Sequence, residues 1–209
     1  TAEQWEHAQG VMKELLDDLG IEYKVGVDEA AFYGPKLDIQ IKNVFGKEDT
    51  IVTIQIDMLL AEKFGMYYID ENNEKVLPYI IHRTSMGCYE RTLALLIEKY
   101  AGALPTWMAP EQVRFLPVTE RAVDYCNALA KNLEMEGFRV TVDARNEKIG
   151  KKIREGQIEK VPYMLVVGDR DMENGTVSPR HRADGDLGAM DFADFAKILK
   201  EVVDTKAKK

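Results

Sequence analysis

The sequence predicts a two-domain α/β protein: an α+β first domain built on an antiparallel sheet, and a second domain that is an α/β sandwich with a mostly parallel mixed sheet. Strands with alternating apolar and polar residues fill much of the first half, which is typical of antiparallel sheets. In the second half, apolar runs of strand length alternate with helical patterns, which favours a parallel sheet. Between the halves, the two prolines of LPTWMAP at 104–110 interrupt helices and central strands, so we expect domains at 1–108 and 109–209.

The first half opens with a predicted helix at 2–19, where apolar residues recur at helical spacing until Gly20 ends the pattern. After a Gly-Pro turn, alternating residues at 37–41 predict a half-buried strand. The other elements expected here are a short strand at 21–27, an alternating strand at 49–58, a hairpin of 66–69 with 75–83, and a helix that follows Gly87 and ends at Tyr100.

The second half alternates strands and helices. The expected strands are 113–118, 139–143, 163–167 and 176–182, and the expected helices are 121–137, 149–160 and 191–203. Asp191 is a plausible N-cap of the last helix.

The charge is unevenly distributed along the chain. The formal net charge is -8, which argues against a general nucleic-acid binder held by bulk positive charge. Residues 1–110 contain 10 Lys and Arg against 18 Asp and Glu, whereas residues 111–209 contain 18 of each. The whole acidic excess therefore lies in the first half, and the second half is left balanced.

Several features favour a cytoplasmic protein with no membrane partner. No apolar stretch approaches the roughly 20 residues of a membrane span, and no charged-then-apolar leader opens the sequence. The two cysteines, Cys88 and Cys126, form neither a CxxC pair nor a disulfide framework. This usage fits a reducing compartment.

The stretch Pro78–Tyr100, PYIIHRTSMGCYERTLALLIEKY, combines an apolar run with a helical pattern, and Gly87 lies between them. Arg91 falls in the first turns of the helix, where a cation gains nothing from the helix dipole, so its position suggests a partner. From the spacing alone, the favoured partner is a nearby carboxylate such as Glu90.

The same stretch carries a family resemblance. GCYER after a hydrophobic strand resembles motif 3 of the class II aminoacyl-tRNA synthetases, whose Arg packs on the adenine of ATP through a cation–π contact. The flanking IIHR and EKYAGALPTWMAP make the chain similar to the threonyl-tRNA synthetase family in particular. The resemblance implies that Arg91 is a catalytic residue that binds ATP.

Two further motifs extend the resemblance through the first half. FYGPK at 32–36 and TIQID at 53–57 are close to the family pattern. Together with motif 3 they imply a threonine and ATP pocket lined by Tyr33, Lys36, Thr53, Gln55, Cys88 and Arg91, with Lys36 also catalytic. Taken alone, Thr53, Gln55 and Asp57 would read as the solvated outer face of one strand. The chain departs from the family at Cys88, where Ser is common, and at 49–52, where DTIV replaces the usual Trp-Gln-Cys-Gly.

His82 is the candidate metal ligand. A lone His on a strand is usually structural, and its spacing alone supports no metal site. The resemblance implies that His82 is the last of three protein ligands of a zinc ion, the other two lying upstream of this chain, so we expect the chain alone not to hold Zn²⁺. Zinc would let the intact enzyme tell threonine from valine, two isosteres that an apolar pocket separates poorly. Mg²⁺ is the second expected cofactor, bound with ATP.

A basic segment at 145–160 is the candidate tRNA-binding region. Pairs such as Glu147 with Lys151 would make it an ordinary solvated helix face. However, NEKIGKKIREGQIEKVPYMLVVGDRDMENGTVSPR resembles the anticodon-binding domain shared by the threonyl, prolyl, histidyl and glycyl enzymes. The residues that this resemblance matches to anticodon binding are Asn146, Arg154, Lys160, Asp171 and Arg180. Lys151 and Lys152 are expected to hold tRNA phosphates.

The resemblance implies a family of enzymes that join threonine to ATP and pass it to tRNA(Thr), as homodimers when intact. Motifs 1 and 2 of the class II core are not found in the chain, so we expect it alone to be inactive but able to bind tRNA. The alternative is a stand-alone tRNA-binding or regulatory module without catalysis. Retention of Tyr33, Gln55, His82 and Arg91 weighs against that alternative.

Overall fold

A computed structural model describes residues 2–208. The chain divides into two compact units, Thr1–Leu95 and Leu96–Lys209, which are described separately below as unit 1 and unit 2. The division falls inside helix α3 (Tyr89–Tyr100). The proline-bearing segment lies with unit 2, because Arg139 donates hydrogen bonds to the carbonyls of Trp107 and Ala109. The expected domain boundary at residues 108 and 109 stays a prediction.

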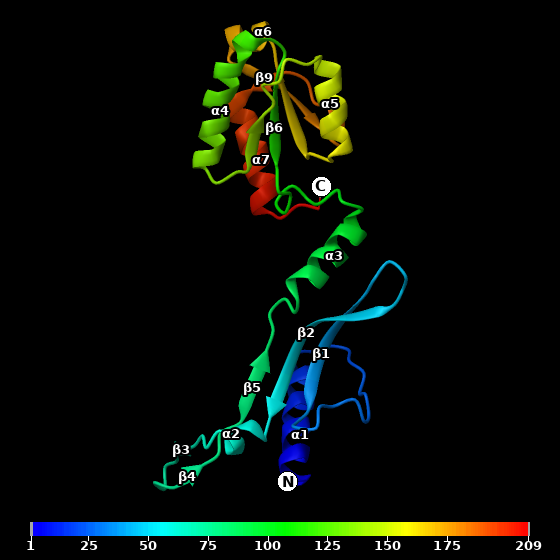
Figure 1. Ribbon diagram of the computed structural model, residues 1–209, viewed down its shortest axis with the longest axis vertical. Coiled ribbons are helices and arrows are strands. Elements are labelled where there is room, and N and C mark those ends of the chain that lie inside the picture. Colours follow the sequence, from blue (N-terminus) through cyan, green and yellow to red (C-terminus); the bar gives the residue numbers. More distant parts are fainter. Residues whose placement is uncertain (1, 209) are drawn as a thin grey trace. The chain divides into compact units, whose positions relative to one another are not determined.

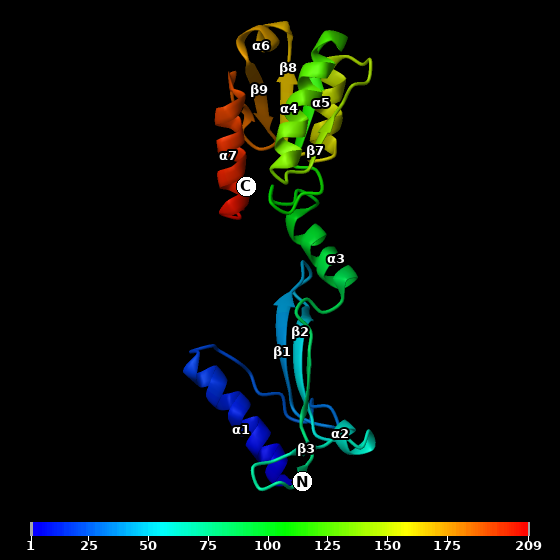
Figure 2. The ribbon, with the colours of Figure 1, turned by 90° about the vertical axis from the view of Figure 1, so that its left-hand side faces the viewer.

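Unit 1 is built on a three-stranded antiparallel sheet with the order β1-β2-β5. Figures 1 and 2 show this sheet together with the N-terminal helix α1. The strands of the sheet are β1 (Lys36–Lys42), β2 (Glu48–Asp57) and β5 (Ile80–Arg83). The other elements are α1 (Ala2–Asp18), the short helix α2 (Leu60–Lys63), and the two-stranded hairpin of β3 (Tyr68–Ile69) and β4 (Lys75–Val76).

Two motif glycines allow close contact with the backbone of β2. A Cβ added to Gly34 would lie 1.7 Å from the carbonyl oxygen of Ile56. A Cβ on Gly87 would lie 2.5 Å from the carbonyl oxygen of Ile51, and the φ of Gly87 is +62°. No side chain fits either distance, and L-residues are strained at this φ. The close backbone contacts therefore explain why YGPK and GCYER have glycine at these two positions.

Two strand predictions in unit 1 are wrong. Residues 21–27 form no strand, because this segment is mostly exposed and pairs with no neighbouring strand. The expected second hairpin strand at 75–83 is two strands, β4 and β5, separated by a segment that contains Pro78, whose nitrogen has no hydrogen to donate to a ladder. β5 pairs with β2 in the main sheet, while β4 pairs with β3. Helix α2 was not predicted.

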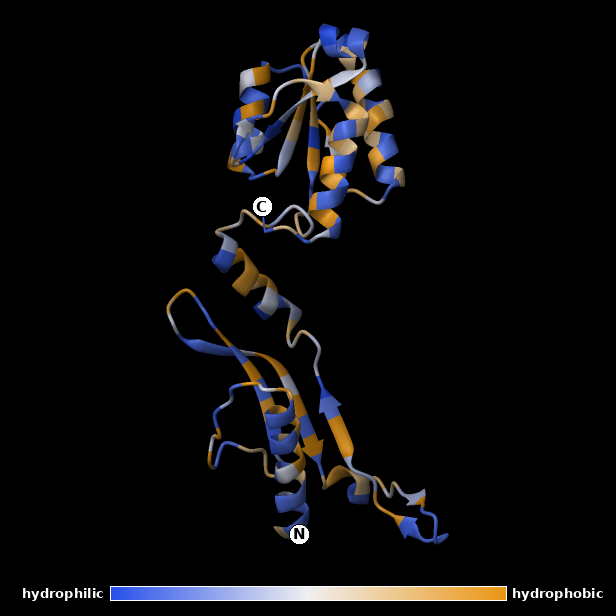
Figure 3. Ribbon diagram, turned by 180° about the vertical axis from the view of Figure 1, so that it is seen from behind, coloured by the Kyte–Doolittle hydropathy of each residue, from blue (hydrophilic) through white to orange (hydrophobic). Residues whose placement is uncertain are grey.

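Unit 1 leaves much of its apolar surface uncovered. Among its described residues, the buried apolar side chains are Ala8, Pro35 and Ala61, and α3 buries none. Phe32 and Phe45 are 83% and 86% exposed. Figure 3 shows both apolar and polar residues along the strands of this sheet.

Unit 2 is an α/β sandwich with a mixed sheet in the order β10-β9-β8-β6-β7, and β11 also pairs with β9. β6 runs parallel to both β7 and β8, whereas β9 is antiparallel to β8. The strands are β6 (Val113–Pro117), β7 (Val140–Val142), β8 (Tyr163–Val167), β9 (Thr176–His181), β10 (Gly185–Asp186) and β11 (Met190–Asp191). The helices are η1 (Glu120–Ala122), α4 (Val123–Met135), α5 (Ile149–Ile158), α6 (Asp169–Asn174) and α7 (Phe192–Asp204).

Helices cover both faces of this sheet, as Figure 1 shows, with α4 and α7 on one side and α5 on the other. The larger core cluster joins one face to α4 and α7 and includes Phe115, Cys126, Leu165 and Phe195. The smaller cluster joins the other face to α5 through Leu116, Val161 and Met164. Because residues 115 and 116 face opposite ways along β6, this strand contributes to both core clusters.

The predicted fold class is confirmed, and the expected strands and helices of unit 2 are all present. The elements α6, β10 and β11 were not expected from the sequence, because they are short and their apolar residues do not recur at a regular spacing. Asp191 occupies the N-cap position of α7, but its side chain makes no capping hydrogen bond. Within residues 2–208, no helix is long and apolar enough to cross a membrane.

Candidate functional site

The polar residues of β2 are paired with side chains from neighbouring segments. The hydroxyl of Thr53 donates to Asp38 Oδ1 at 2.8 Å, and the hydroxyl of Tyr33 donates to Gln55 Oε1 at 2.6 Å. Asp57 Oδ2 lies 2.9 Å from His82 Nε2. Thr53, Gln55 and Asp57 therefore do not form a freely solvated outer face, because the side chain of each is hydrogen-bonded to a partner.

Tyr33, Gln55 and His82 form one cluster at the end of β2. Gln55 and His82 are directly opposite each other in the β2–β5 register. The rings of Tyr33 and His82 are 6.1 Å apart, edge to face. The structure therefore brings together two residues of the predicted threonine and ATP pocket and the predicted zinc ligand.

Asp57 is the buried member of this site. Its side chain is 0% exposed, while that of its partner His82 is 43% exposed. Asp57 Oδ1 also accepts hydrogen bonds from the backbone N–H groups of Leu59 and Leu60, both at 2.9 Å. Burial raises the pKa of Asp57, but these donors and His82 outweigh burial, so the net pKa lies below its ordinary value. Asp57 is therefore an ionised carboxylate at neutral pH.

Lys36 is held by a second carboxylate. Its Nζ lies 2.6 Å from Asp38 Oδ2, and the other oxygen of Asp38 accepts the Thr53 hydroxyl. Asp38 thus links a predicted catalytic lysine to a predicted pocket residue. Asp38 was not predicted as a site residue. Its position on the polar side of an alternating strand was the one feature of the sequence that could have indicated it.

Arg91 and Cys88 lie at the other end of β2. Arg91 Nη1 donates to the carbonyl of Thr50 at 3.3 Å. Glu90 is not its partner, because that carboxylate accepts a hydrogen bond from Cys88 Sγ at 2.9 Å, which also lowers the pKa of Glu90. Thr50 and Gln55 are five residues apart, about 17 Å along an extended strand. The structure therefore separates Arg91 and Cys88 from the cluster around His82.

The described residues fit only one zinc ligand. Asp57 holds His82 Nε2, and His82 Nδ1 makes no hydrogen bond to any residue of 2–208. No group of three or more His, Cys, Asp or Glu side chains in that range could hold a metal ion. His82 can contribute one nitrogen to a metal whose other ligands come from elsewhere.

In unit 2, the predicted anticodon residues Asp171 and Arg180 lie near β9. Alternate side chains of β9 are partly exposed, and those between them are buried. Asp171 Oδ1 accepts hydrogen bonds from the hydroxyls of Thr176 and Ser178 at 3.0 and 3.3 Å. Arg180 Nη1 donates to Asp186 at 2.8 Å, and its buried Nε has no hydrogen-bond partner within residues 2–208.

The other three predicted anticodon residues lie along or beside α5. Asn146 follows β7 and Asp171 follows β8, so both lie beyond the carboxyl ends of strands that run parallel to β6. Arg154 is exposed on α5. Lys160 lies just past the C-terminal end of α5, about 15 Å along the helix axis from the N-terminal end near Asn146. It donates a hydrogen bond to the carbonyl of Ala101. The five residues therefore do not converge on a single point.

The basic segment contains fewer free cations than its composition indicates. Lys152 is 3% exposed, and its Nζ donates to the carbonyls of Pro117 and Asp143 at 3.2 and 2.8 Å. The expectation that Lys152 holds tRNA phosphates is therefore wrong, because its charge is buried beneath α5. Lys151 pairs with Glu147 at 2.6 Å, as the alternative interpretation of this segment expected. Arg145 pairs with Asp143 and Glu155.

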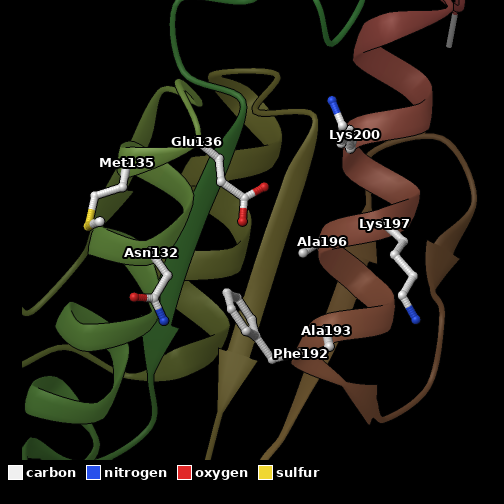
Figure 4. Close-up of a pocket in the computed structure, with 8 residues that line it drawn as sticks. All are labelled: Asn132, Met135, Glu136, Phe192, Ala193, Ala196, Lys197 and Lys200. Carbon is white, nitrogen blue, oxygen red and sulfur yellow. The ribbon is translucent and has the colours of Figure 1, made fainter.

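A hollow between α4 and α7 contains none of the predicted site residues. Figure 4 shows Glu136 and Phe192 directed into the space between the helices, while Lys197 points away from it. Its lining residues are Asn132, Met135, Glu136, Phe192, Ala193, Ala196, Lys197 and Lys200.

Comparison with known proteins assigns both parts of the chain. The family described as "tRNA synthetase class II core domain (G, H, P, S and T)" matches residues 2–100, and the family described as "Anticodon binding domain" matches residues 112–202. A core segment followed by this domain defines the chain as part of a class II aminoacyl-tRNA synthetase.

The similar proteins narrow this class. A "Threonine--tRNA ligase" of Clostridium perfringens (strain SM101 / Type A) is 59% identical over 201 residues, which are 96% of this chain and 31% of that protein. Another, of Acetivibrio thermocellus, is 48% identical over 204 residues, 98% of this chain and 32% of that protein. The structure titled "Crystal Structure of the RNA binding domain of Threonyl-tRNA synthetase from Cryptosporidium parvum Iowa II" has a TM-score of 0.85 and 32% identity, covering 97% of this chain and 51% of that chain.

The chain belongs to the threonyl-tRNA synthetase family, and corresponds to the end of the class II core together with the anticodon-binding domain. It spans about a third of the length of the curated relatives that it matches.

Proposed function

We propose that this chain is part of a threonine–tRNA ligase, which activates threonine with ATP, releases pyrophosphate and passes the threonyl group to tRNA(Thr). The observation that carries the proposal is the cluster of Tyr33, Gln55 and His82 on the polar side of β2. A binding module without chemistry would have no use for a paired tyrosine, an amide and an exposed histidine beside one another. The names of the similar proteins support the same activity.

In this proposal, the two ends of β2 serve the two parts of the activated amino acid. Threonine binds at the end with Tyr33, Gln55 and His82. At the other end Arg91, an exposed residue whose Nη1 donates to the carbonyl of Thr50, stacks on the adenine of ATP. Lys36, held by Asp38, lies on β1 directly opposite Gln55, where a fixed ammonium can neutralise phosphate charge. Thr53 contributes by holding Asp38, and Cys88 lies beside the ATP end.

Two cations complete the proposed site. His82 would supply one ligand to Zn²⁺, which would bind the threonine amino and hydroxyl groups and so exclude valine. Mg²⁺ would bind the ATP phosphates. The protein's own contribution is positioning: it holds the amino acid and the nucleotide in place through side chains fixed by hydrogen bonds.

Unit 2 is proposed to bind the anticodon of tRNA(Thr). Asn146, Asp171 and Arg180 would read bases, while Arg154 and Lys160 would contact the backbone. We also propose that the intact enzyme is a cytoplasmic homodimer.

The test is threonine-dependent ATP–pyrophosphate exchange by the intact protein that contains this chain, with valine and serine as competing substrates. We expect exchange with threonine and strong rejection of valine. Residues 1–209 alone should show no exchange but should retain tRNA(Thr) in a filter-binding assay. Activation of a different amino acid by the intact protein, or no exchange at all, would refute the proposal.

A further inference from the structure

We propose that Asp57 is a positioning residue for His82: it fixes the imidazole as the Nε2–H tautomer and thereby leaves Nδ1 as the nitrogen that binds a ligand. The tautomer follows from the geometry of this chain. Its use for binding zinc or threonine rests on the proposed function.

The carboxylate of Asp57 is fixed from both sides. Oδ1 accepts the N–H groups of Leu59 and Leu60 at the corner between β2 and α2, both at 2.9 Å. This anchoring leaves Oδ2 for His82 Nε2, also at 2.9 Å. The side chain is 0% exposed, so no water competes for that oxygen.

An ionised carboxylate can only accept hydrogen bonds, so the hydrogen between Asp57 and His82 must lie on Nε2. Both oxygens of Asp57 face donors, since Oδ1 accepts two backbone N–H groups and Oδ2 faces His82 Nε2, and this is the arrangement of an ionised carboxylate. In a neutral imidazole a hydrogen on Nε2 leaves a lone pair on Nδ1. His82 Nδ1 has no hydrogen-bond partner within residues 2–208.

The neighbouring groups do not offer His82 another strong acceptor. Gln55 lies directly opposite in the register, but its Oε1 already accepts the Tyr33 hydroxyl at 2.6 Å. Yet the His82 side chain is 43% exposed, so the ring is anchored on one side and open on the other. A histidine anchored by a buried carboxylate and open at its second nitrogen is the usual arrangement for a metal ligand.

A simpler role for Asp57 would be to cap the corner before α2 and nothing more. Asp57→Asn separates the two roles, because asparagine keeps an oxygen for Leu59 and Leu60 but presents an NH₂ donor to His82. His82 Nε2 must then accept, and its hydrogen moves to Nδ1. Asp49→Asn is the matched control, since Asp49 is another β2 carboxylate, which accepts from Asn43 and does not contact His82.

The first measurement is a ¹⁵N long-range correlation spectrum of the histidine rings in the chain labelled with ¹⁵N-histidine, at pH 8. His82→Gln assigns the signal among the three histidines. We expect the Nε2–H pattern in the parent chain and in the control variant Asp49→Asn. We expect the Nδ1–H pattern in Asp57→Asn. An Nδ1–H tautomer in the parent chain overturns the proposal even if Asp57→Asn fails to fold.

The second measurement is zinc affinity of the intact protein, by metal analysis after dialysis against a zinc buffer series. We expect Asp57→Asn to weaken zinc binding by about 10- to 100-fold, with Asp49→Asn unchanged. Unchanged zinc affinity in a folded Asp57→Asn variant would overturn the positioning role. A parent protein that holds no zinc while its tautomer switches as expected would refute the zinc part of the proposed function and leave the positioning of His82 standing.

Discussion

Lys152 Nζ donates a hydrogen bond to the carbonyl oxygen of Pro117 across 35 residues of sequence, at 3.2 Å, and both ends of this contact are buried. A second hydrogen bond, 2.8 Å long, runs to the carbonyl of Asp143. One ammonium on α5 thus ties together the ends of β6 and β7. It serves the fold of unit 2 and cannot reach a phosphate.

Replacing Lys152 with Met should destabilise unit 2, because two carbonyls lose their donor while side-chain volume is kept. We expect a loss of about 1–3 kcal/mol in the free energy of unfolding. Lys151→Met is the matched control, since Lys151 is 51% exposed and paired on the surface, and should cost less than about 1 kcal/mol. Urea unfolding, followed by the labelling of Cys126 in the core of this unit, measures both. Equal stability of the two variants would contradict the structural role of Lys152.

The two cysteines should differ sharply in reactivity. Burial raises the pKa of Cys126 to about 12 and leaves it 0% exposed, whereas Cys88 is exposed. Because the thiolate is the reactive form, a thiol reagent at pH 8 should modify one cysteine in the native chain and both in urea. The variant Cys88→Ser should show no rapidly reacting thiol until it is unfolded. Fast labelling of native Cys88→Ser would mean that the core around Cys126 is open.

Gly87→Ala should disrupt the start of α3 far more than Gly46→Ala disrupts its turn. Both glycines have positive φ, +62° and +76°, but a Cβ on Gly87 would meet the Ile51 carbonyl at 2.5 Å, while nothing lies within 4 Å of one on Gly46. Gly46→Ala should therefore cost only the conformational strain, about 1–2 kcal/mol. Gly87→Ala adds an overpacking cost of about 1–3 kcal/mol. Thermal unfolding of the intact protein compares the two variants, and similar midpoints would show that the close approach at Ile51 is unimportant.

The apolar pattern of the sequence predicts the fold correctly where the elements are long. It fails where the pairing of strands determines which element forms. Residues 21–27 have the composition of a strand but no strand beside them, so no ladder forms. β4 and β5 look like one strand, and only the partner of each strand shows that they belong to different sheets. Strand pairing of this kind depends on residues distant in sequence, which an apolar pattern does not reveal.

The candidate site shows the same limit. The motifs point to Tyr33, Gln55, His82 and Arg91, but not to Asp57, the carboxylate that holds His82. Asp57 stands within TIQID and reads as one more polar residue of an alternating strand, although it is fully buried. Lys152 stands in a basic run and reads as a surface cation, although its position on the buried side of α5 removes it from solvent. Burial of a charged residue depends on which carbonyls the fold brings to it.

The last prediction concerns how Arg180 takes part in anticodon recognition. Arg180 Nη1 is paired with Asp186, whose side chain is 59% exposed, so this surface ion pair is weak and can be exchanged for a base edge. Arg180→Ala should therefore reduce the preference for the cognate anticodon by about 1–3 kcal/mol. Asp186→Asn keeps Arg180 and weakens only the ion pair that Arg180 forms with residue 186. This variant should therefore retain the preference for the cognate anticodon. Lys197→Ala, which removes an exposed cation paired with Asp194 on α7, is the control for general charge loss.

Fluorescence titrations of the chain against tRNA(Thr) and an anticodon-swapped tRNA, each at two salt concentrations, separate base reading from phosphate contact. Phosphate contacts release counterions, so their loss lowers the salt dependence of binding for both tRNAs alike. A lost base contact instead weakens the cognate tRNA alone. We expect the second pattern for Arg180→Ala and neither pattern for Lys197→Ala. If Arg180→Ala weakens both tRNAs equally and reduces the salt slope, then Arg180 contacts the backbone, and its place as a reader of bases must be given up.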